Sequence, residues 1–225
     1  LADWPPDGLA QRRASYTRTL AILIHRHAQK LVDAWDPASG NFLAQVENAG
    51  SGASVYESAQ RAMNAITNAM FYVEVEVKDV KIATPAGISD FCPTASCPDA
   101  VESPWSDRSL EHIEQNLIAF ERLYYGGAPG VGVDGGAPTT GGNGFDDLLR
   151  TIGQDDLAMR VEAALASARE AVPTVPAPLE TAVQSSLSDV EAFYQVLRGL
   201  TTLVKTEFIA ILDLERPPVA GSDTD

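Results

Sequence analysis

Residues 79–125 read DVKIATPAGISDFCPTASCPDAVESPWSDRSLEHIEQNLIAFERLYY, and this stretch decides the fold. One helix is expected to end in its first part, at TPAG (84–87), because proline and glycine terminate helices. A loop with two cysteines follows. A second helix is expected to begin at Ser106 or Ser109, which are both good N-caps, and to run to Tyr125. Polar residues therefore gather near two helix ends, where free backbone groups can meet a ligand.

Four of these polar residues form the predicted ligand site. Glu102 and Ser106 lie just before the second of these helices, and Asp79 and Lys81 lie in the last turns of the helix before them. The free amides at the helix start could also bind an anion. The alternative is that the same residues cap the helix and form a buried ion pair that holds the loop. The residues taken alone favour this second interpretation.

The two cysteines of the chain, Cys92 and Cys97, are predicted to form a disulfide. Their C-x4-C spacing differs from the C-x2-C of zinc knuckles and thioredoxin-like sites, and both lie beside prolines in a loop. A disulfide implies an oxidising compartment. Two free thiols in a cytosolic protein are the alternative.

The rest of the chain has the three- to four-residue apolar periodicity of helices. Helices are expected over about 9–35, 54–82, 145–152, 155–171 and 186–212. Residues 72–77 alternate like a strand, but they continue a helical stripe and no strand partner is evident. Residues 126–144 contain nine glycines and are predicted to form a flexible surface loop. The chain is therefore predicted to be all-α, a single domain (1–225) built as an up-and-down helical bundle with long loops.

The first of these helices is predicted to bury one apolar face in the core. The residues of this face recur at helical spacing: Tyr16, Leu20, Ile24, His27, Leu31 and Trp35. His27 lies on the same face and is expected to be a hydrogen-bonded core histidine. His25, two positions away, points to another side of the helix, so the two histidines do not form a metal-binding pair.

The charge of the chain excludes one class of partner. The sequence contains 31 acidic and 16 basic side chains, for a net charge of −15. Nucleic acid is a poor partner, because phosphate binding needs clustered lysine and arginine. The charge favours cationic partners or metal ions, and solubility is the simpler alternative explanation. No apolar run is long enough for a transmembrane segment. The chain begins at Leu1 without a recognisable signal peptide, so a processed chain or a fragment is expected.

With these residues in place, the chain resembles the imelysin family, which includes insulin-cleaving metallopeptidase-like and iron-regulated protein A-like proteins. The resemblance covers nearly the whole chain. The matching segments are DVKI (79–82) with PAG (85–87), VESPWS (101–106), SLEHI (109–113) with NL (116–117), and GFDDLL (144–149).

This resemblance implies two packed helical halves with a metal or ligand site between them. The family signature G-x-H-x-x-E belongs to the first half, and this chain contains no H-x-x-E. The chain therefore resembles the second, C-terminal half, and its partner would be the missing N-terminal half or a companion chain. Glu102 and Ser106 would line the site, and Asp79 and Lys81 would support it.

The resemblance also implies a cofactor and a location. The cofactor would be a divalent metal or iron, with ligands mainly outside this chain. The protein would be periplasmic or anchored to the outer membrane, with an iron-uptake partner in the cell envelope, and this location agrees with a disulfide.

Three functions follow from these observations. The favoured one is an extracytoplasmic protein that binds a metal ion or a small ligand in connection with iron uptake. The second is a metallopeptidase, which would need three protein ligands and a general base, with the ligands in the missing half. The third is a structural or partner-binding helical module. Binding is favoured over proteolysis because three scattered histidines make a poor hydrolase.

Overall fold

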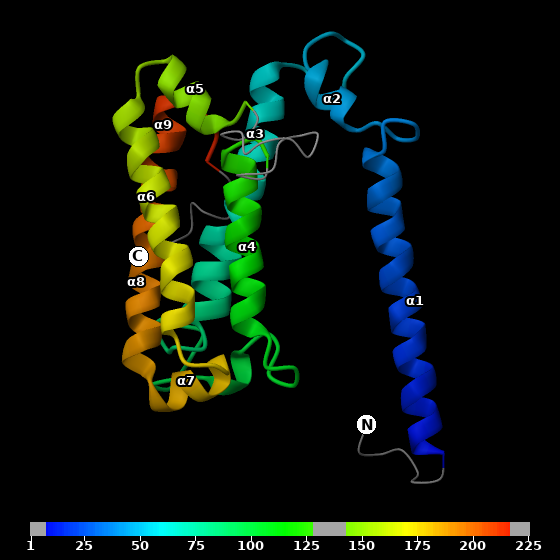
Figure 1. Ribbon diagram of the computed structural model, residues 1–225, viewed down its shortest axis with the longest axis vertical. Helices are drawn as coiled ribbons and strands as arrows, with labels where there is room; N and C mark the ends of the chain where they lie inside the picture. The colour runs from blue at the N-terminus through cyan, green and yellow to red at the C-terminus, as the bar shows by residue number, and fades with distance from the viewer. Residues whose placement is uncertain (1–7, 128–142, 217–225) are drawn as a thin grey trace, which may run out of the picture. The chain divides into compact units, whose positions relative to one another are not determined.

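The computed structural model describes residues 8–127 and 143–216 of the chain. Every regular element in these two ranges is a helix, and no strand occurs in them (Figure 1). The predicted all-α class is confirmed. Most of the predicted glycine-rich loop (126–144) lies outside the described residues. Within the described part, no helix combines the length and the apolar character that crossing a membrane requires.

The chain divides into two compact units, residues 1–62 and 63–225. The first unit contains α1 (Leu9–Trp35) and α2 (Leu43–Glu47). The predicted bounds of α1 are confirmed. The end of α1 is held by aromatic contacts, because the ring of Trp35 lies 5.1 Å from that of Phe42 in an edge-to-face arrangement.

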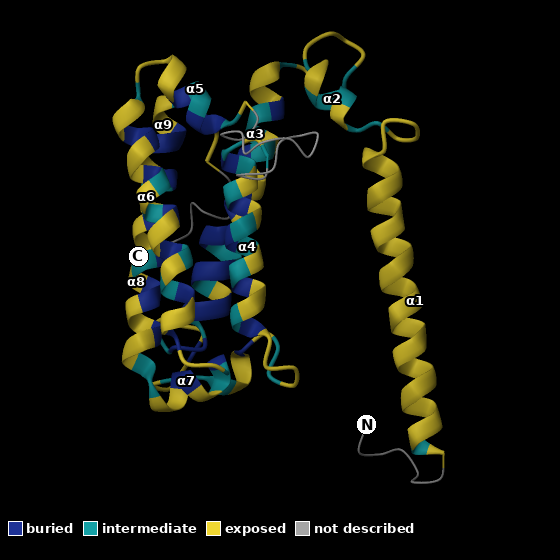
Figure 2. Cartoon of the chain, in the orientation of Figure 1, coloured by how far each residue is buried: buried dark blue, intermediate teal, exposed yellow. Residues whose placement is uncertain are grey.

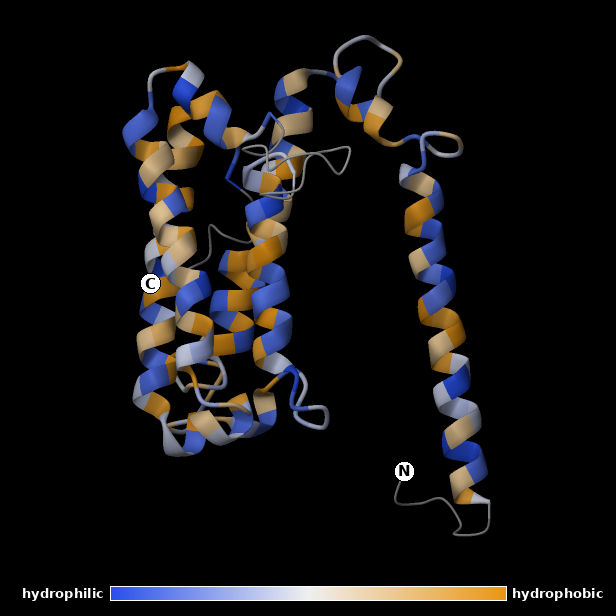
Figure 3. Cartoon of the chain, in the orientation of Figure 1, coloured by the Kyte–Doolittle hydropathy of each residue, from blue (hydrophilic) through white to orange (hydrophobic). Residues whose placement is uncertain are grey.

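The predicted burial of the α1 stripe is wrong. No residue of α1 is buried, and Ile24 and Leu31 are 69% and 65% exposed. His27 is also exposed, and its side chain makes no hydrogen bond in the described residues. Figure 3 shows apolar residues spread along α1, whereas Figure 2 shows the helix exposed along almost its whole length. Amphipathic periodicity identifies the apolar face of a helix, but it does not specify what covers that face.

The second unit is a helical bundle. It contains most of α3 (Ala59–Met70). Its other α-helices are α4 (Ser109–Tyr124), α5 (Phe145–Thr151), α6 (Asp155–Ala171), α7 (Leu179–Ser185), α8 (Leu187–Leu203) and α9 (Ile209–Ile211). Two π-helical segments, η1 (Val73–Ala83) and η4 (Val204–Phe208), and two short 3₁₀ turns, η2 (Pro98–Ala100) and η3 (Val172–Thr174), complete it. Helix α8 packs against both α6 and η1, and η1 packs against α4 (Figure 1).

The core of this bundle lies where these four elements meet. Val77 of η1, Leu117 of α4, Val161 of α6 and Leu197 of α8 have no exposed surface. Buried residues line the inner sides of these helices in Figure 2. These residues recur at helical spacing along the sequence, so the hydrophobic effect accounts for the packing of this unit.

The expected helix over 54–82 differs in its details. The α-helix begins at Ala59 and ends at Met70, and the chain continues as the π-helix η1. The wider turn is visible in the backbone, where the Thr84 N–H donates to the carbonyl of Asp79, five residues earlier, at 2.9 Å. The strand-like alternation over 72–77 therefore belongs to a helix, as predicted, but to one of unusual pitch.

The start of α4 also differs from the prediction. Neither Ser106 nor Ser109 is the N-cap, because the cap position is held by Arg108 without a side-chain hydrogen bond. Ser109 is the first residue of the helix, and its buried hydroxyl accepts a hydrogen bond from the backbone N–H of Ser103 at 3.3 Å. This contact fixes the segment that precedes α4.

The predicted disulfide between Cys92 and Cys97 is present, with a Cα–Cα distance of 5.8 Å. The loop that it closes is attached to the end of η1, because the Cys97 N–H donates to the Pro85 carbonyl at 2.8 Å. Gly87 permits this close approach. Its φ is +74°, and a Cβ there would lie only 2.3 Å from the carbonyl oxygen of Ala95.

Candidate functional site

The candidate site lies where the end of η1 meets the segment that leads into α4. Val101 is buried and anchors this segment in the core. The hydrogen bond from Ser103 to Ser109 then holds the next residues against the first turn of α4. Glu102, between these two anchors, is thereby directed toward Lys81 on η1.

The side chains of Lys81 and Glu102 form an ion pair. Lys81 Nζ lies 3.1 Å from Glu102 Oε2, and the two side chains are 7% and 41% exposed. The same ammonium group donates to Asn116 Oδ1 at 2.9 Å and lies 5.3 Å from the centre of the Tyr72 ring. A buried ammonium needs such partners to offset its lost hydration. Lys81 is therefore a buried support beneath a carboxylate that reaches solvent.

His112 completes this cluster from the first turns of α4. Its Nδ1 lies 3.8 Å from Glu102 Oε2 and 3.3 Å from Ser103 Oγ. Its Nε2 has no hydrogen-bond partner within the described residues, and the side chain is 48% exposed. The carboxylate and the hydroxyl thus orient the ring from one side, and the other nitrogen remains available to a ligand.

The four site residues predicted from the sequence have different environments. Lys81 and Glu102 lie together, as described above. Asp79 is paired with Lys78, at 2.6 Å between Oδ1 and Nζ. Ser106 is exposed, and its hydroxyl donates to the carbonyl of Ser103 at 3.4 Å. In the described part of the chain, Ser106 makes no hydrogen bond to either member of the Lys81–Glu102 pair.

Sequence reasoning missed His112 and Asn116. Glu114 is two residues away from His112 along the helix, so its side chain diverges from that of His112 and the two do not form a metal-binding pair. The spacing that matters is four residues, because His112 and Asn116 lie on the same face of α4 and both contact members of the ion pair. This i, i+4 pattern, placed after Glu102, was the signal available in the sequence.

The cluster does not by itself form a metal site. No group of three or more His, Cys, Asp or Glu side chains in the described residues is placed to hold a metal ion. The Lys81 ammonium beside Glu102 Oε2 also disfavours a cation at that oxygen. What the cluster offers a metal is one imidazole nitrogen, His112 Nε2, supported by a carboxylate and a hydroxyl in the manner of supported metal-binding histidines.

A second polar cluster joins α5 and α6. Arg150 Nη1 lies 3.0 Å from Asp146 Oδ2, and its other terminal nitrogen pairs with Glu162. Burial raises the pKa of Asp146 above its ordinary value. Burial, reinforced by the nearby carboxylate of Glu162, also raises the pKa of Tyr125 to about 12. These groups hold helices together, and their contacts give them a structural role.

The comparisons with known proteins give one match. A family model described as Imelysin matches residues 4–204 of the chain. No curated protein and no solved structure matches it significantly.

Proposed function

Because the chain belongs to the imelysin family, we propose that it is an extracytoplasmic binding protein that holds a metal ion in connection with iron uptake. The main support for this proposal is the arrangement of Lys81, Glu102 and His112. In this proposal, His112 supplies the ligating atom and the other two residues orient it.

The contacts of the cluster assign a separate task to each side chain. Lys81 is almost fully buried and fixes the position of the Glu102 carboxylate. Glu102 and Ser103 face Nδ1 of His112, which directs Nε2 toward solvent. A histidine held through one nitrogen loses less side-chain entropy when the other nitrogen binds a ligand.

The metal is a divalent ion or iron. When bound, the metal would either be the cargo itself or act as a Lewis acid that polarises a bound ligand. Imidazole is a suitable ligand for iron as well as for zinc. The strong negative charge of the chain, −15, raises the local concentration of cations around it.

The remaining ligands come from a second helical half. The imelysin signature G-x-H-x-x-E belongs to the first half of the family pattern, and this chain carries the motifs of the second half. The first half is supplied by the same polypeptide or by a companion chain, and the two meet at the His112 cluster.

The proposed location is the periplasm or the outer-membrane surface. The disulfide between Cys92 and Cys97 supports an oxidising compartment, because such bonds persist outside the cytosol.

Anaerobic equilibrium dialysis with Fe²⁺ tests this proposal. Because this chain supplies a single imidazole ligand, weak binding is expected for the wild-type chain at high Fe²⁺ concentration. It is expected to be lost in His112→Gln and to be about tenfold weaker still in Glu102→Gln, because loss of an orienting partner typically costs 10- to 100-fold in affinity. Glu114→Gln is the matched control, since it removes the same charge from α4, the helix that carries His112.

The test depends on how the wild-type chain and the three variants rank in their affinity for Fe²⁺. Equal binding by all four proteins would mean that Fe²⁺ associates with the acidic surface in general, and it would overturn the proposal. Absence of Fe²⁺ from the wild-type chain would overturn it as well.

A further inference from the structure

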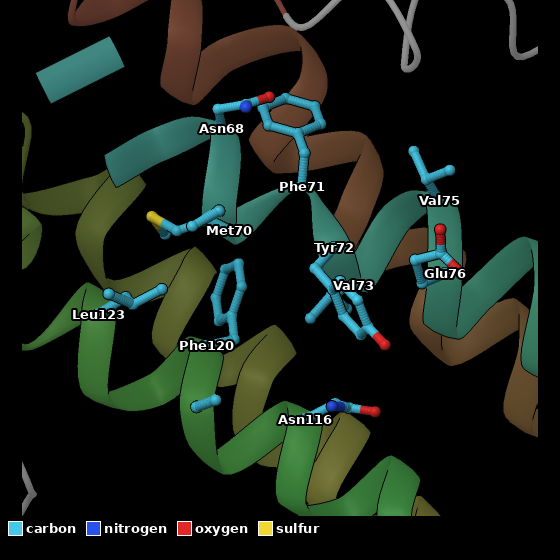
Figure 4. Close-up of a pocket in the computed structure, with 12 residues that line it drawn as sticks. Asn68, Met70, Phe71, Tyr72, Val73, Val75, Glu76, Asn116, Phe120 and Leu123 are labelled. Atoms are coloured by element: carbon cyan, nitrogen blue, oxygen red, sulfur yellow. The ribbon is translucent and has the colours of Figure 1, made fainter. Parts of the chain in front are cut away.

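A pocket with a mixed lining lies beside the His112 cluster, and Tyr72 and Asn116, which contact Lys81, also line it. Its volume is about 500 Å³, and it is formed by residues of α3, the start of η1 and the middle of α4. This volume falls within the range of small-molecule sites, roughly 300–1,000 Å³. Figure 4 shows its lining residues.

One end of the pocket is apolar. Met70, Phe120 and Leu123 gather there (Figure 4), and Val73 adds to the same surface. Met70, Val73 and Phe120 are almost fully buried and form a rigid base, and the surface that a ligand can touch comes from the more exposed Ala69, Ala119 and Leu123. This end therefore offers a firm apolar surface, which favours an apolar group by removing it from water.

The other end is polar and carries a negative charge. Tyr72, Glu76 and Asn116 lie there (Figure 4). The Glu76 carboxylate makes no ion pair or hydrogen bond with any side chain that the structure describes. Asn116 Oδ1 accepts a hydrogen bond from Lys81, so the amide N–H groups of Asn116 point away from Lys81.

The charge of this end comes from Glu76. Lys81 contacts Asn116 and Tyr72 from behind, but Glu102 compensates its charge at 3.1 Å. Glu76 also lies in the first turn of η1, where a carboxylate is favoured by the helix dipole, and this accounts for its stability without a partner. The carboxylate is thus available to a cation that enters the pocket.

We propose that this pocket binds an amphiphile with an apolar body and a cationic amine end. The apolar body lies on Ala69, Ala119 and Leu123, and the ammonium group pairs with Glu76 at the polar end. This inference goes beyond the proposed metal site, since it uses neither His112 nor Glu102.

Two probes with the same chain and opposite charge test the proposal. Decylamine and sodium decanoate are titrated into the full chain by calorimetry, below the concentrations at which they form micelles. Saturable binding of one decylamine is expected, with decanoate at least roughly tenfold weaker, a difference that the titration resolves directly.

Three variants locate the binding. Glu76→Gln is expected to weaken decylamine by roughly tenfold, whereas Glu170→Gln removes the same charge from an exposed position on α6 and is expected to change nothing. Ala119→Phe fills the pocket from an exposed position of α4, so it is expected to abolish binding without disturbing the core.

Several results would overturn the proposal. These are decanoate binding as tightly as decylamine, equal weakening by Glu76→Gln and Glu170→Gln, unchanged binding in Ala119→Phe, and absence of saturable binding. His112→Gln is expected to leave decylamine binding intact, so failure here and failure of the metal proposal are distinguishable.

Discussion

The buried ammonium of Lys81 lies 3.1 Å from the half-exposed carboxylate of Glu102, and this pair joins the end of η1 to the segment before α4. The pair has an unequal environment, because Lys81 is enclosed while Glu102 remains open to solvent. The main effect of this ion pair is to fix the position of the Glu102 side chain. It holds a carboxylate beside His112, and the site in this part of the chain depends on that placement.

The two π-helical segments are joined by a buried ion pair, and breaking it is expected to destabilise the fold. Lys205 Nζ of η4 lies 2.8 Å from Glu74 Oε1 of η1, with side-chain exposures of 17% and 2%. Lys205→Met leaves the Glu74 charge in the interior with less compensation, and a loss of about 3 kcal/mol is expected. Urea unfolding measures it, and Lys205→Arg, which retains the charge, should lose much less. Equal losses in the two variants would contradict this account.

Tyr124 joins α4 to α6 through a hydrogen bond in the core. It has no exposed surface, and its hydroxyl donates to the carbonyl of Ala158 at 3.2 Å. Tyr124→Phe keeps the ring and removes the bond, so a loss of about 1 kcal/mol in unfolding free energy is expected. Tyr16→Phe, on exposed α1, is the control and should have no measurable effect. A Tyr124→Phe protein as stable as wild type would show that the bond contributes nothing.

Reduction of the Cys92–Cys97 disulfide is expected to cost about 2 kcal/mol, since a short loop constrains the unfolded chain only modestly. Thermal unfolding with and without reductant measures this cost. The double variant Cys92→Ser/Cys97→Ser should have the stability of the reduced wild type and should not respond to reductant. If reductant destabilised the double variant to the same extent, the effect would have another origin.

Asp146 is expected to make stability decrease as the pH rises. Burial raises its pKa in the folded protein above the ordinary value of 3.8, so the folded state holds this proton more tightly than the unfolded chain does. The resulting stabilisation is fully present below pH 3.8 and is lost as the pH rises through the raised pKa.

Asp146→Asn removes this titration, although it also weakens the pair with Arg150. Relative to wild type, the variant should therefore become more stable as the pH increases across that window. Urea unfolding at a series of pH values checks this, and a difference that does not change with pH would contradict it.

Local patterns in the sequence predicted most of the helices. The bounds of α1 and α6 follow from Pro37 and Gly40 after the first helix and from the acidic start and apolar periodicity of the second. The π-helical pitch of η1 could not be predicted in this way. It accompanies a tertiary interaction, the burial of Glu74 against Lys205, which is far away in the sequence. The exposure of the α1 stripe has a similar reason, since periodicity carries no information about a covering partner.

The candidate site was predicted in part. Clustering of polar residues at helix ends identified Lys81 and Glu102, which do lie together. Asp79 is instead paired with its sequence neighbour Lys78, and the helix-end pattern alone does not show which of the two lysines it contacts. His112 was missed because its contacts depend on how the loop returns to α4, and this return is fixed by the Ser103–Ser109 hydrogen bond.

The central claim is that His112 is the metal-binding group of this chain, and its imidazole resonances test that claim most directly. The chain contains three histidines, so His25 and His27 on α1 serve as internal controls. Zn²⁺, which is diamagnetic, is titrated while the ring nitrogens are followed by two-dimensional ¹H–¹⁵N NMR. The account predicts that Nε2 of His112 shifts first and saturably, and that this response is reduced in Glu102→Gln. Equal shifts of all three histidines, or no shift of His112, would contradict it.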